Sequence, residues 1–217
     1  MKILKVVLAC FALIVATFLI IAAFLPAEFT VSRSQSIDAP PVIVFAQVND
    51  LKQWEAWQPW LVEDPDMELM YSATTIGEGA SYTWSSDKTG DGKLTITESV
   101  MGEKIVNDVD FGPNGNGQGE FLFAPEGDGT KVTWTMRGNL PYPTGRYFGP
   151  MMDSMLGAQF EDGLTRLKTV SEKDAQGLGG LGKVLGQGMH ELGKELGKAL
   201  DEAGIDMNKA LDEALSQ

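Results

Sequence analysis

The sequence predicts an α+β fold in which an antiparallel sheet of about seven strands packs against one long helix, with two short helices after the first strand. The first observation is the segment FTVSRSQSI, residues 29–37, which alternates apolar and polar side chains. The second is a series of six further strand-like segments between residues 67 and 138, separated by glycine-rich turns. The third is a helical pattern from Gly145 to Ser171. Strands in series with helices segregated from them are typical of α+β domains.

An uncharged segment, VVLACFALIVATFLIIAAFL, occupies residues 6–25 ahead of the first strand. At about 1.5 Å per residue, a helix of this length spans the roughly 30 Å hydrocarbon core of a bilayer. A cleaved signal peptide is the alternative, but its apolar region is roughly 7 to 15 residues long. The sequence therefore predicts a transmembrane anchor over residues 1–27, with the membrane as a partner through residues 6–25.

The charges beside this segment predict its orientation. Lys2 and Lys5 precede it, whereas the first charge after it is Glu28. Because cytoplasmic flanks carry the excess of Lys and Arg, we expect the N-terminus in the cytoplasm. The protein is then expected in a bacterial inner membrane as a single-pass protein with a periplasmic domain.

The two short helices follow the first strand. Asp38 can cap a helix whose first turn accommodates Pro40 and Pro41 and which ends near Asp50. A second short helix follows within the segment WEAWQPW, residues 54–60.

Three tryptophans lie at every third position of that segment. Trp54 and Trp57 belong to the short helix, which Pro59 ends, and Trp60 follows. Aromatic rings at this spacing suit either a ligand-binding box or a packing wedge. A buried indole N–H needs an acceptor, which nearby carbonyls or the acidic turn at residues 63–66 can supply.

Large apolar side chains share one face on three of the later strands, GASYTWSS, GQGEFLFAP and GTKVTWTMRG. An ordinary core would use the same face, but so many aromatic side chains and a methionine aimed at one helix favour an adaptable apolar pocket. The candidate ligand-binding residues on this face are Tyr82, Trp84, Phe121, Phe123, Trp134 and Met136.

Two charged residues share strand faces with apolar residues and join these candidates. Glu98 continues the period-two row of Leu94 and Ile96, and Arg33 follows Val31 on the first strand in the same way. A buried carboxylate costs several kcal/mol unless it is paired, hydrated or protonated. The two charges either reach solvent from strand ends or anchor the polar end of a ligand. Acid catalysis by Glu98 is a third interpretation, although the domain offers it no histidine or cysteine partner.

The segment IVNDVDF places Val106, Asp108 and Asp110 on one face and Asn107 and Val109 on the other. We interpret the two aspartates as part of a wetted outer face, because two carboxylates on one strand do not form the closed oxygen cage that calcium needs. The glycine-rich segment of residues 112–119 lacks the lysine of a phosphate-binding loop and precedes no helix, so it predicts a hairpin turn.

Composition excludes several classes of function. The net charge of −13 repels phosphate backbones, so we expect no nucleic-acid partner. The only histidine is His190 and the only cysteine is Cys10, which leaves no histidine-based metal site and no Ser-His-Asp triad. We therefore expect no metal, no other cofactor and no catalytic residue.

The composition changes beyond Ser171, and residues 173–217 form a tail rich in glycine and leucine. Glycine costs up to about 1 kcal/mol per helical position, so this helix should be weak alone and form mainly against a membrane, a partner protein or its own copy. A frayed tail is the alternative. The leucines follow helical spacing at positions Leu178, Leu181, Leu185, Leu192, Leu196 and Leu200.

Several segments in order resemble a known superfamily: FTVSRSQSIDAPPVIVFAQVNDLKQWEAWQPW, EDPDMEL, GEGASYTW, GDGKLTITE, GTKVTWTMRGN and FEDGLTRLK. Over residues 28–172 the chain resembles the SRPBCC superfamily with the START-like helix-grip fold, in its polyketide cyclase/dehydrase and lipid-transport branch. The resemblance implies a curved sheet around a long helix, a cavity for lipids, sterols or other apolar molecules, and a packing role for Trp54 and Trp57. It implies a class of ligand and no particular molecule.

Three functions remain open. The first is a membrane-tethered, non-catalytic binder of an apolar small molecule or lipid, which the anchor and the cavity-type fold favour. The second is a cyclase/dehydrase-type enzyme in which Glu98 and Arg33 steer a reactive substrate. The third is a protein-interaction module that uses the tail and the domain surface.

Overall fold

The structure is a computed structural model that describes residues 2–202 of the 217-residue chain. Its elements in order are α1 (Lys2–Phe24), β1 (Glu28–Ile37), α2 (Pro41–Asn49), the 3-10 turn η1 (Gln53–Ala56), α3 (Trp60–Glu63), β2 (Glu68–Tyr71), β3 (Ser81–Ser85), β4 (Gly92–Val100), β5 (Lys104–Asp110), η2 (Gly112–Asn114), β6 (Asn116–Glu126), β7 (Gly129–Asn139), η3 (Gly145–Phe148) and α4 (Gly149–Glu202).

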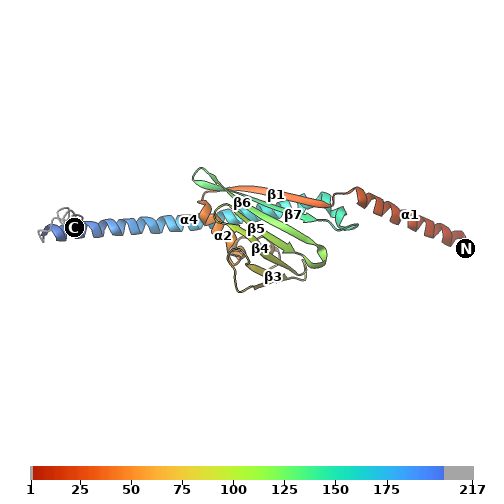
Figure 1. Cartoon of the computed structure of the whole chain (residues 1–217), viewed down its shortest axis with the longest axis horizontal. Coiled ribbons are helices and arrows are strands. Elements are labelled where there is room, and N and C mark those ends of the chain that lie inside the picture. The colour runs from red at the N-terminus through yellow and green to blue at the C-terminus, as the bar shows by residue number, and fades with distance from the viewer. Residues whose placement is uncertain (1, 203–217) are drawn as a thin grey trace, which may run out of the picture. The chain divides into compact units, whose positions relative to one another are not determined.

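The seven strands form one antiparallel sheet in the order β1-β7-β6-β5-β4-β3-β2, with α4 packed against one face (Figure 1). The predicted helix-grip α+β fold is confirmed. The second short helix differs in detail, because Pro59 precedes a further helical turn, α3, which the sequence pattern did not predict. Proline is accepted at the start of a helix, so it marks a beginning here as well as an end.

The core lies between the sheet and the first part of α4. Phe160, Leu164 and Leu167 recur at helical spacing on α4 and are at most 1% exposed. The Phe160 ring stacks on Trp134 of β7, with ring centroids 4.0 Å apart and planes 11° from parallel. The period-two face of the strand and the helical face of α4 therefore meet in one aromatic layer.

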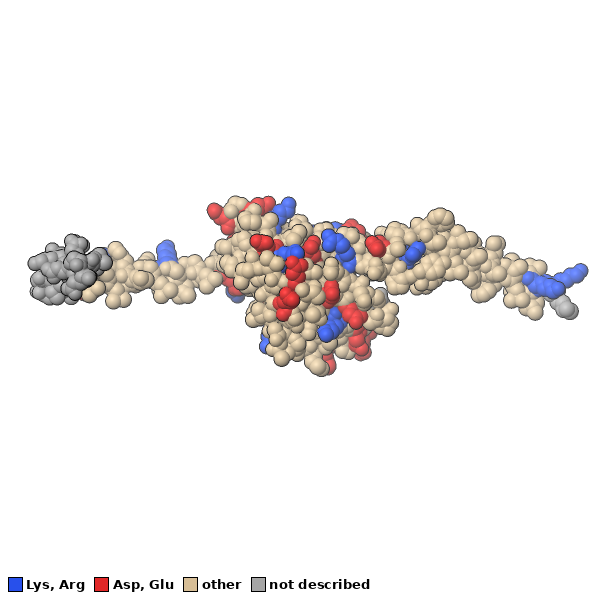
Figure 2. Space-filling view, viewed as in Figure 1, with Lys and Arg blue, Asp and Glu red and all other residues tan. Residues whose placement is uncertain are grey.

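The first helix, α1, is long and apolar enough to cross a membrane. Its charged side chains, Lys2 and Lys5, lie at its start, and the rest of its surface is uncharged (Figure 2). In a soluble fold, large apolar side chains of this kind would be mostly buried, whereas Ala22 is the one buried residue of α1.

The chain divides into two compact units at the boundary between Glu172 and Lys173. The predicted helix ends at Ser171, but α4 continues to Glu202, because the tail contains no proline and keeps its helical spacing. In the second unit the leucine side chains from Leu178 to Leu196 are exposed. The surface that would cover them stays a prediction, and the Leu200 side chain and residues 203–217 lie outside the described part of the chain.

Candidate ligand cavity

A cavity of about 170 Å³ lies between the sheet and the beginning of α4. It slightly exceeds the roughly 150 Å³ of an engineered apolar cavity that holds benzene, so it has room for one ring or a short acyl segment. Its wall consists of Trp54, Gln58, Trp60, Met67, Tyr82, Trp84, Thr89, Leu94, Asn107, Val109, Phe111, Gly119, Trp134, Met136 and Leu156.

The cavity occupies the end of the sheet at which β1 begins and β7 ends. The pairs Glu28–Asn139 and Asp110–Asn116 mark this end, and Phe111 and Met136 of the wall lie within three residues of it. At the opposite end the space is filled, because Phe45 of α2 packs edge-on against Phe123 at 5.5 Å. One end of the domain is therefore packed and the other is partly hollow.

Asn107 of β5 brings an amide into this apolar wall. Its side chain is 2% exposed, and its Nδ2 atom has no hydrogen-bond partner among the described residues. It pairs across the sheet with Gly119, where a Cβ atom would lie 2.5 Å from the Asn107 Oδ1 atom. Glycine at position 119 leaves the space that the amide occupies. A buried donor without a partner costs about 1 to 3 kcal/mol, so this N–H suits an acceptor on a ligand.

Two further polar side chains lie on the wall. The Tyr82 hydroxyl donates to Gln58 Oε1 at 3.5 Å, and both side chains are buried. Burial raises the pKa of the Tyr82 phenol, so it remains a neutral hydrogen-bond donor at physiological pH. The wall therefore combines apolar surface with the neutral polar side chains of Asn107, Tyr82, Gln58 and Thr89.

Four of the six aromatic and methionine candidates lie on the wall: Tyr82, Trp84, Trp134 and Met136. Phe121 is 0% exposed, packs against Trp54, Trp57 and Trp134, and is not among the wall residues. Phe123 packs against α2. Strand alternation placed all six on the helix-facing side, but the hollow extends along only part of each strand.

The predicted orientation of Glu98 is wrong. The pairing of β4 with β5 shifts between Ile96, opposite Asn107, and Glu98, opposite Val106. This β-bulge inserts one residue and turns the following side chains to the other face. Glu98 therefore lies on the outer face, where its Oε1 atom is 2.7 Å from Lys104 Nζ, and it does not reach the cavity.

Arg33 lies on the predicted face of β1 but forms ion pairs with α4 and is not part of the cavity wall. Its guanidinium donates to Asp153 at 2.9 Å and to Glu161 at 2.7 Å. It lies against Gly157, where a Cβ atom would overlap the Nη2 atom. The hydrogen bond from Arg33 holds the pKa of the Asp153 carboxyl below its usual value. Arg33, which was expected to anchor a ligand, instead joins β1 to α4, the helix that covers the cavity, through these ion pairs.

The tryptophan segment proves to be mainly a packing wedge. Trp54 and Trp57 are 2% and 0% exposed, and their indole N–H groups donate to the carbonyls of Val48 at 2.8 Å and Gln47 at 3.2 Å. Trp60 is partly exposed and packs edge-on against Trp134 at 5.6 Å. Trp54 and Trp60 also contribute to the cavity wall.

Asn107, Gln58 and Leu156 line the cavity but were not among the ligand-binding residues predicted from the sequence. A signal for Asn107 was present, because it alternates with Val109 on a face opposite the wetted aspartates. A polar residue in a row of buried apolar residues indicates a possible binding site. A leucine such as Leu156 gives no such indication, because leucine is equally common in a cavity wall and in a packed core.

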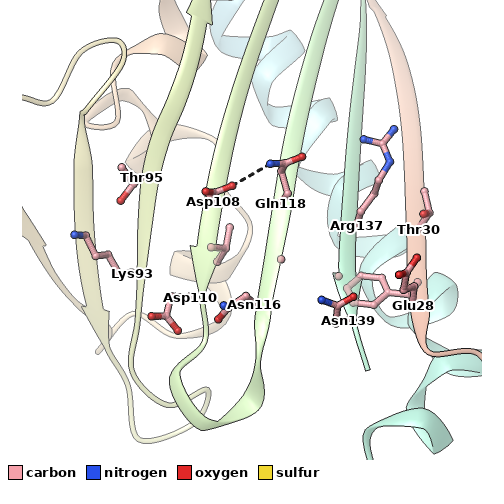
Figure 3. Close-up of a pocket in the computed structure, with 14 residues that line it drawn as sticks. Glu28, Thr30, Lys93, Thr95, Asp108, Asp110, Asn116, Gln118, Arg137 and Asn139 are labelled. Atoms are coloured by element: carbon pink, nitrogen blue, oxygen red, sulfur yellow. Dashed lines mark hydrogen bonds between the residues drawn. The ribbon is translucent and has the colours of Figure 1, made fainter. Parts of the chain in front are cut away.

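A second, larger hollow of about 530 Å³ lies on the outer face of the sheet (Figure 3). Side chains of both charges surround it, and Gln118 donates to Asp108 at 3.1 Å. Asp108 and Asp110 are exposed there, as expected for a wetted face, and within residues 2–202 no group of three or more His, Cys, Asp or Glu side chains could hold a metal ion. The hollow is open and polar, so the inner cavity is the better candidate for an apolar ligand.

Asp64 contacts the loop between β3 and β4, which carries Thr89 of the cavity wall, through a hydrogen bond and an ion pair. This carboxylate is 6% exposed, accepts a hydrogen bond from the Ser86 hydroxyl and lies 3.3 Å from Lys88 Nζ. The hydrogen bond from Ser86 is the main reason that the pKa of Asp64 is below its ordinary value of 3.8.

A lowered pKa in the folded state predicts acid sensitivity. The stabilisation by ionised Asp64 is present above the unfolded pKa and is lost as pH falls through the folded pKa, within the range of about pH 5 to 1. The melting temperature of Asp64→Asn should therefore fall less between pH 5 and pH 2 than that of the unsubstituted protein. Asp87→Asn, at an exposed position of the same loop, is the control. Parallel curves for all three proteins would contradict the assignment.

The chain matches known proteins over its domain. The family model described as polyketide cyclase / dehydrase and lipid transport matches residues 28–172. The di-domain ARO/CYC StfQ from the steffimycin biosynthetic pathway is similar in structure, with a TM-score of 0.55 and 13% identity over 69% of this chain and 52% of that chain. The Staphylococcus aureus protein SA2116, of unknown function, has a TM-score of 0.53 and 14% identity over 69% of this chain and 96% of its own.

A solution structure from Thermobifida fusca has a TM-score of 0.52 and 20% identity over 66% of this chain and 93% of that chain. No curated protein matches the chain. At such identities the solved structures show a shared fold alone. The family model, however, covers the whole α+β domain, from the start of β1 to Glu172. The chain therefore belongs to the polyketide cyclase / dehydrase and lipid transport family.

Proposed function

We propose that the protein binds an apolar small molecule or lipid bearing one polar oxygen, in the cavity between the sheet and α4, and does not change it chemically. The observation that carries the proposal is the buried Asn107 amide, whose Nδ2 atom lacks a partner in the described chain. A carbonyl, hydroxyl or carboxylate oxygen of a ligand would satisfy this donor, while the aromatic wall would bury the apolar part.

The composition of the wall supports binding over acid–base catalysis. The wall residues include no histidine, cysteine, aspartate, glutamate, lysine or arginine. Tyr82 is the titratable residue among them, and its raised pKa makes it a poor general base at neutral pH. The family also includes polyketide cyclases, so a recovered molecule that the protein converts to another product would favour the second candidate, a cyclase-type enzyme.

We further propose that α1 holds the domain at a bacterial inner membrane, with the N-terminus in the cytoplasm and the domain in the periplasm. The support is the apolar length of α1 and the position of Lys2 and Lys5 at its start. The source of the ligand would then be close to the cavity, because an apolar ligand partitions into the same membrane.

Asn107→Leu should lower the occupancy of the co-purifying ligand about tenfold, because the ligand loses a hydrogen bond worth about 1 to 1.5 kcal/mol. Leucine has a similar size and removes an unpaired polar group, so the melting temperature of the ligand-free protein should hold or rise. Native mass spectrometry of full-length protein extracted from its own membrane measures the occupancy. Asn139→Leu, at an exposed asparagine outside the wall, is the matched control.

Unchanged occupancy in Asn107→Leu would show that the amide is not the polar anchor. Lower occupancy together with a lower melting temperature would show that Asn107 stabilises the fold and not the ligand. No bound molecule in the unsubstituted protein would contradict the binding function itself.

A further inference from the structure

The connection between α1 and the domain is short. Residues Leu25, Pro26 and Ala27 separate Phe24 from β1, and three residues reach at most about 10 Å. The backbone N–H of Leu140 also donates to the Ala27 carbonyl at 2.7 Å. The end of the sheet at which β1 begins and β7 ends therefore lies next to the end of α1. This is the end that contains the cavity.

The segment between β7 and α4, residues 140–148, forms hydrogen bonds with the last turns of α1. The Tyr147 hydroxyl donates to the Phe18 carbonyl at 2.6 Å, and the two rings stack at 4.7 Å. Tyr142 donates to the Leu19 carbonyl at 3.1 Å, and Arg146 donates to the Ala22 carbonyl at 3.2 Å. An arginine at a helix C-terminus pairs with carbonyls that lack a helical partner and complements the helix dipole.

These contacts have a consequence for depth in the membrane. Phe18 precedes Phe24 by six residues, which corresponds to about 9 Å along a helix axis. If the apolar length of α1 spans the bilayer, Tyr147 reaches about as deep as the 5 to 10 Å to which interfacial helices insert. Tyrosine and arginine are also residues that favour the membrane–water interface.

An unpartnered apolar stripe continues from this segment along α4. Phe148, Met151 and Met155 are 53%, 53% and 52% exposed, and their spacing of three and four residues places them on one side of the helix. Gln159 follows Met155 by one turn on the same side and donates to Glu63 of α3. The stripe therefore faces the gap between α4 and α3, where the partly exposed wall residues Trp60 and Leu156 lie.

The size of the cavity agrees with this placement. A space of about 170 Å³ encloses one ring or a short acyl segment and cannot enclose a whole membrane lipid. The remainder of a larger ligand would lie outside the mouth of the cavity, which is the gap between α3 and α4 at Trp60 and Leu156, and would contact the stripe. Exposing this apolar part of the ligand to water is unfavourable, so it would remain in the lipid phase of the membrane.

We propose that a membrane-docking face inserts into the headgroup boundary of the bilayer spanned by α1, and that it consists of Tyr142, Tyr147, Phe148, Met151 and Met155. The cavity then takes up its ligand directly from the leaflet next to the domain. The proposal rests on the tether in the proposed function. Insertion is driven by apolar burial, since the chain's net charge of −13 opposes attraction to anionic lipid. Docking to phosphatidylcholine vesicles should therefore need no anionic lipid and should persist at high salt.

The test uses full-length protein that carries a single environment-sensitive fluorophore and is reconstituted into phosphatidylcholine vesicles containing nitroxide-labelled lipid. The native Cys10 in α1 reports the tether. Met151→Cys and Met155→Cys, each combined with Cys10→Ser, report docking. Asp128→Cys, also combined with Cys10→Ser and placed in the exposed turn between β6 and β7 at the opposite end of the sheet, is the control. We expect blue-shifted, lipid-quenched emission at positions 10, 151 and 155, and neither effect at position 128.

Quenching at position 10 without quenching at positions 151 and 155 would overturn the docking face and leave the tether intact. No quenching at position 10 would overturn the tether, and docking with it. A blue shift at position 151 without quenching, together with cross-linking between copies, would show that a second copy covers the stripe and would overturn the proposal. Phe148→Asp combined with Met151→Asp should remove the quenching at position 155 and retain it at position 10.

Discussion

Trp57→Ala is expected to lower the free energy of unfolding of the domain by about 3 to 5 kcal/mol, the range for truncating a large buried aromatic side chain. The indole is fully buried, and its ring centroid lies 4.8 Å from that of Trp54, 6.0 Å from Trp134 and 6.1 Å from Phe121. The substitution also leaves the Gln47 carbonyl without the indole donor at 3.2 Å. It therefore creates a cavity and removes a buried hydrogen bond at the same point.

Denaturant unfolding of the full-length protein in detergent, followed by tryptophan fluorescence, measures this loss. Trp60→Ala is the matched control, because Trp60 is a partly exposed residue of the same segment and sits at the cavity wall. We expect Trp60→Ala to cost clearly less stability and to affect ligand occupancy more. Equal losses for the two variants would contradict the distinction between the packing wedge and the cavity wall.

Leu156→Trp is expected to lower ligand affinity about 70-fold or more. The larger side chain would occupy the mouth and exclude about 100 Å² of ligand surface from burial, which is worth about 2.5 kcal/mol at 25 cal/mol per Å². The melting temperature of the ligand-free protein should stay the same or rise, because the new ring fills a cavity of about 170 Å³. Loss of binding without loss of stability is the expected signature.

The measurement is a titration with the ligand recovered from the native membrane, alongside a melting curve. Ala158→Trp introduces the same side chain at an exposed position of α4 and should leave affinity unchanged. Undiminished binding to Leu156→Trp would place the ligand elsewhere, with the outer hollow around Asp108 and Arg137 as the next candidate. A large fall in the melting temperature would show that position 156 is tightly packed.

Local patterns in the sequence were sufficient for the seven strands and for the buried face of α4, but not for the short helix α3. Side chains alternate along a strand and recur every three to four residues along a helix for reasons of backbone geometry alone, so the faces of β1, β6 and β7 and the buried face of α4 follow from the residues themselves. The glycine-rich breaks then separate the strands, and short connections favour antiparallel neighbours. The apolar length of α1 likewise depends on nothing beyond its own composition.

The candidate site required the tertiary structure, because its features arise from pairing between distant residues. Glu98 left the predicted face since β4 and β5 shift register by one residue, and no local pattern marks that bulge. Arg33 was correctly placed on its face, but its partners Asp153 and Glu161 lie more than one hundred residues away, on α4.

Alternation along each strand is enough to predict which side chains face inward, whereas the packing of separate elements sets which of these side chains border a cavity. Phe121 and Trp134 belong to the same inward face and stack on each other at 4.9 Å, yet only Trp134 also borders the cavity. Asn107 shows the same division: alternation turns its amide inward, while the hollow beside it is enclosed by side chains from separate elements, such as Trp84 of β3 and Leu156 of α4. Facing inward is set by backbone geometry within one strand, whereas a void depends on how well side chains from separate elements fill a shared volume.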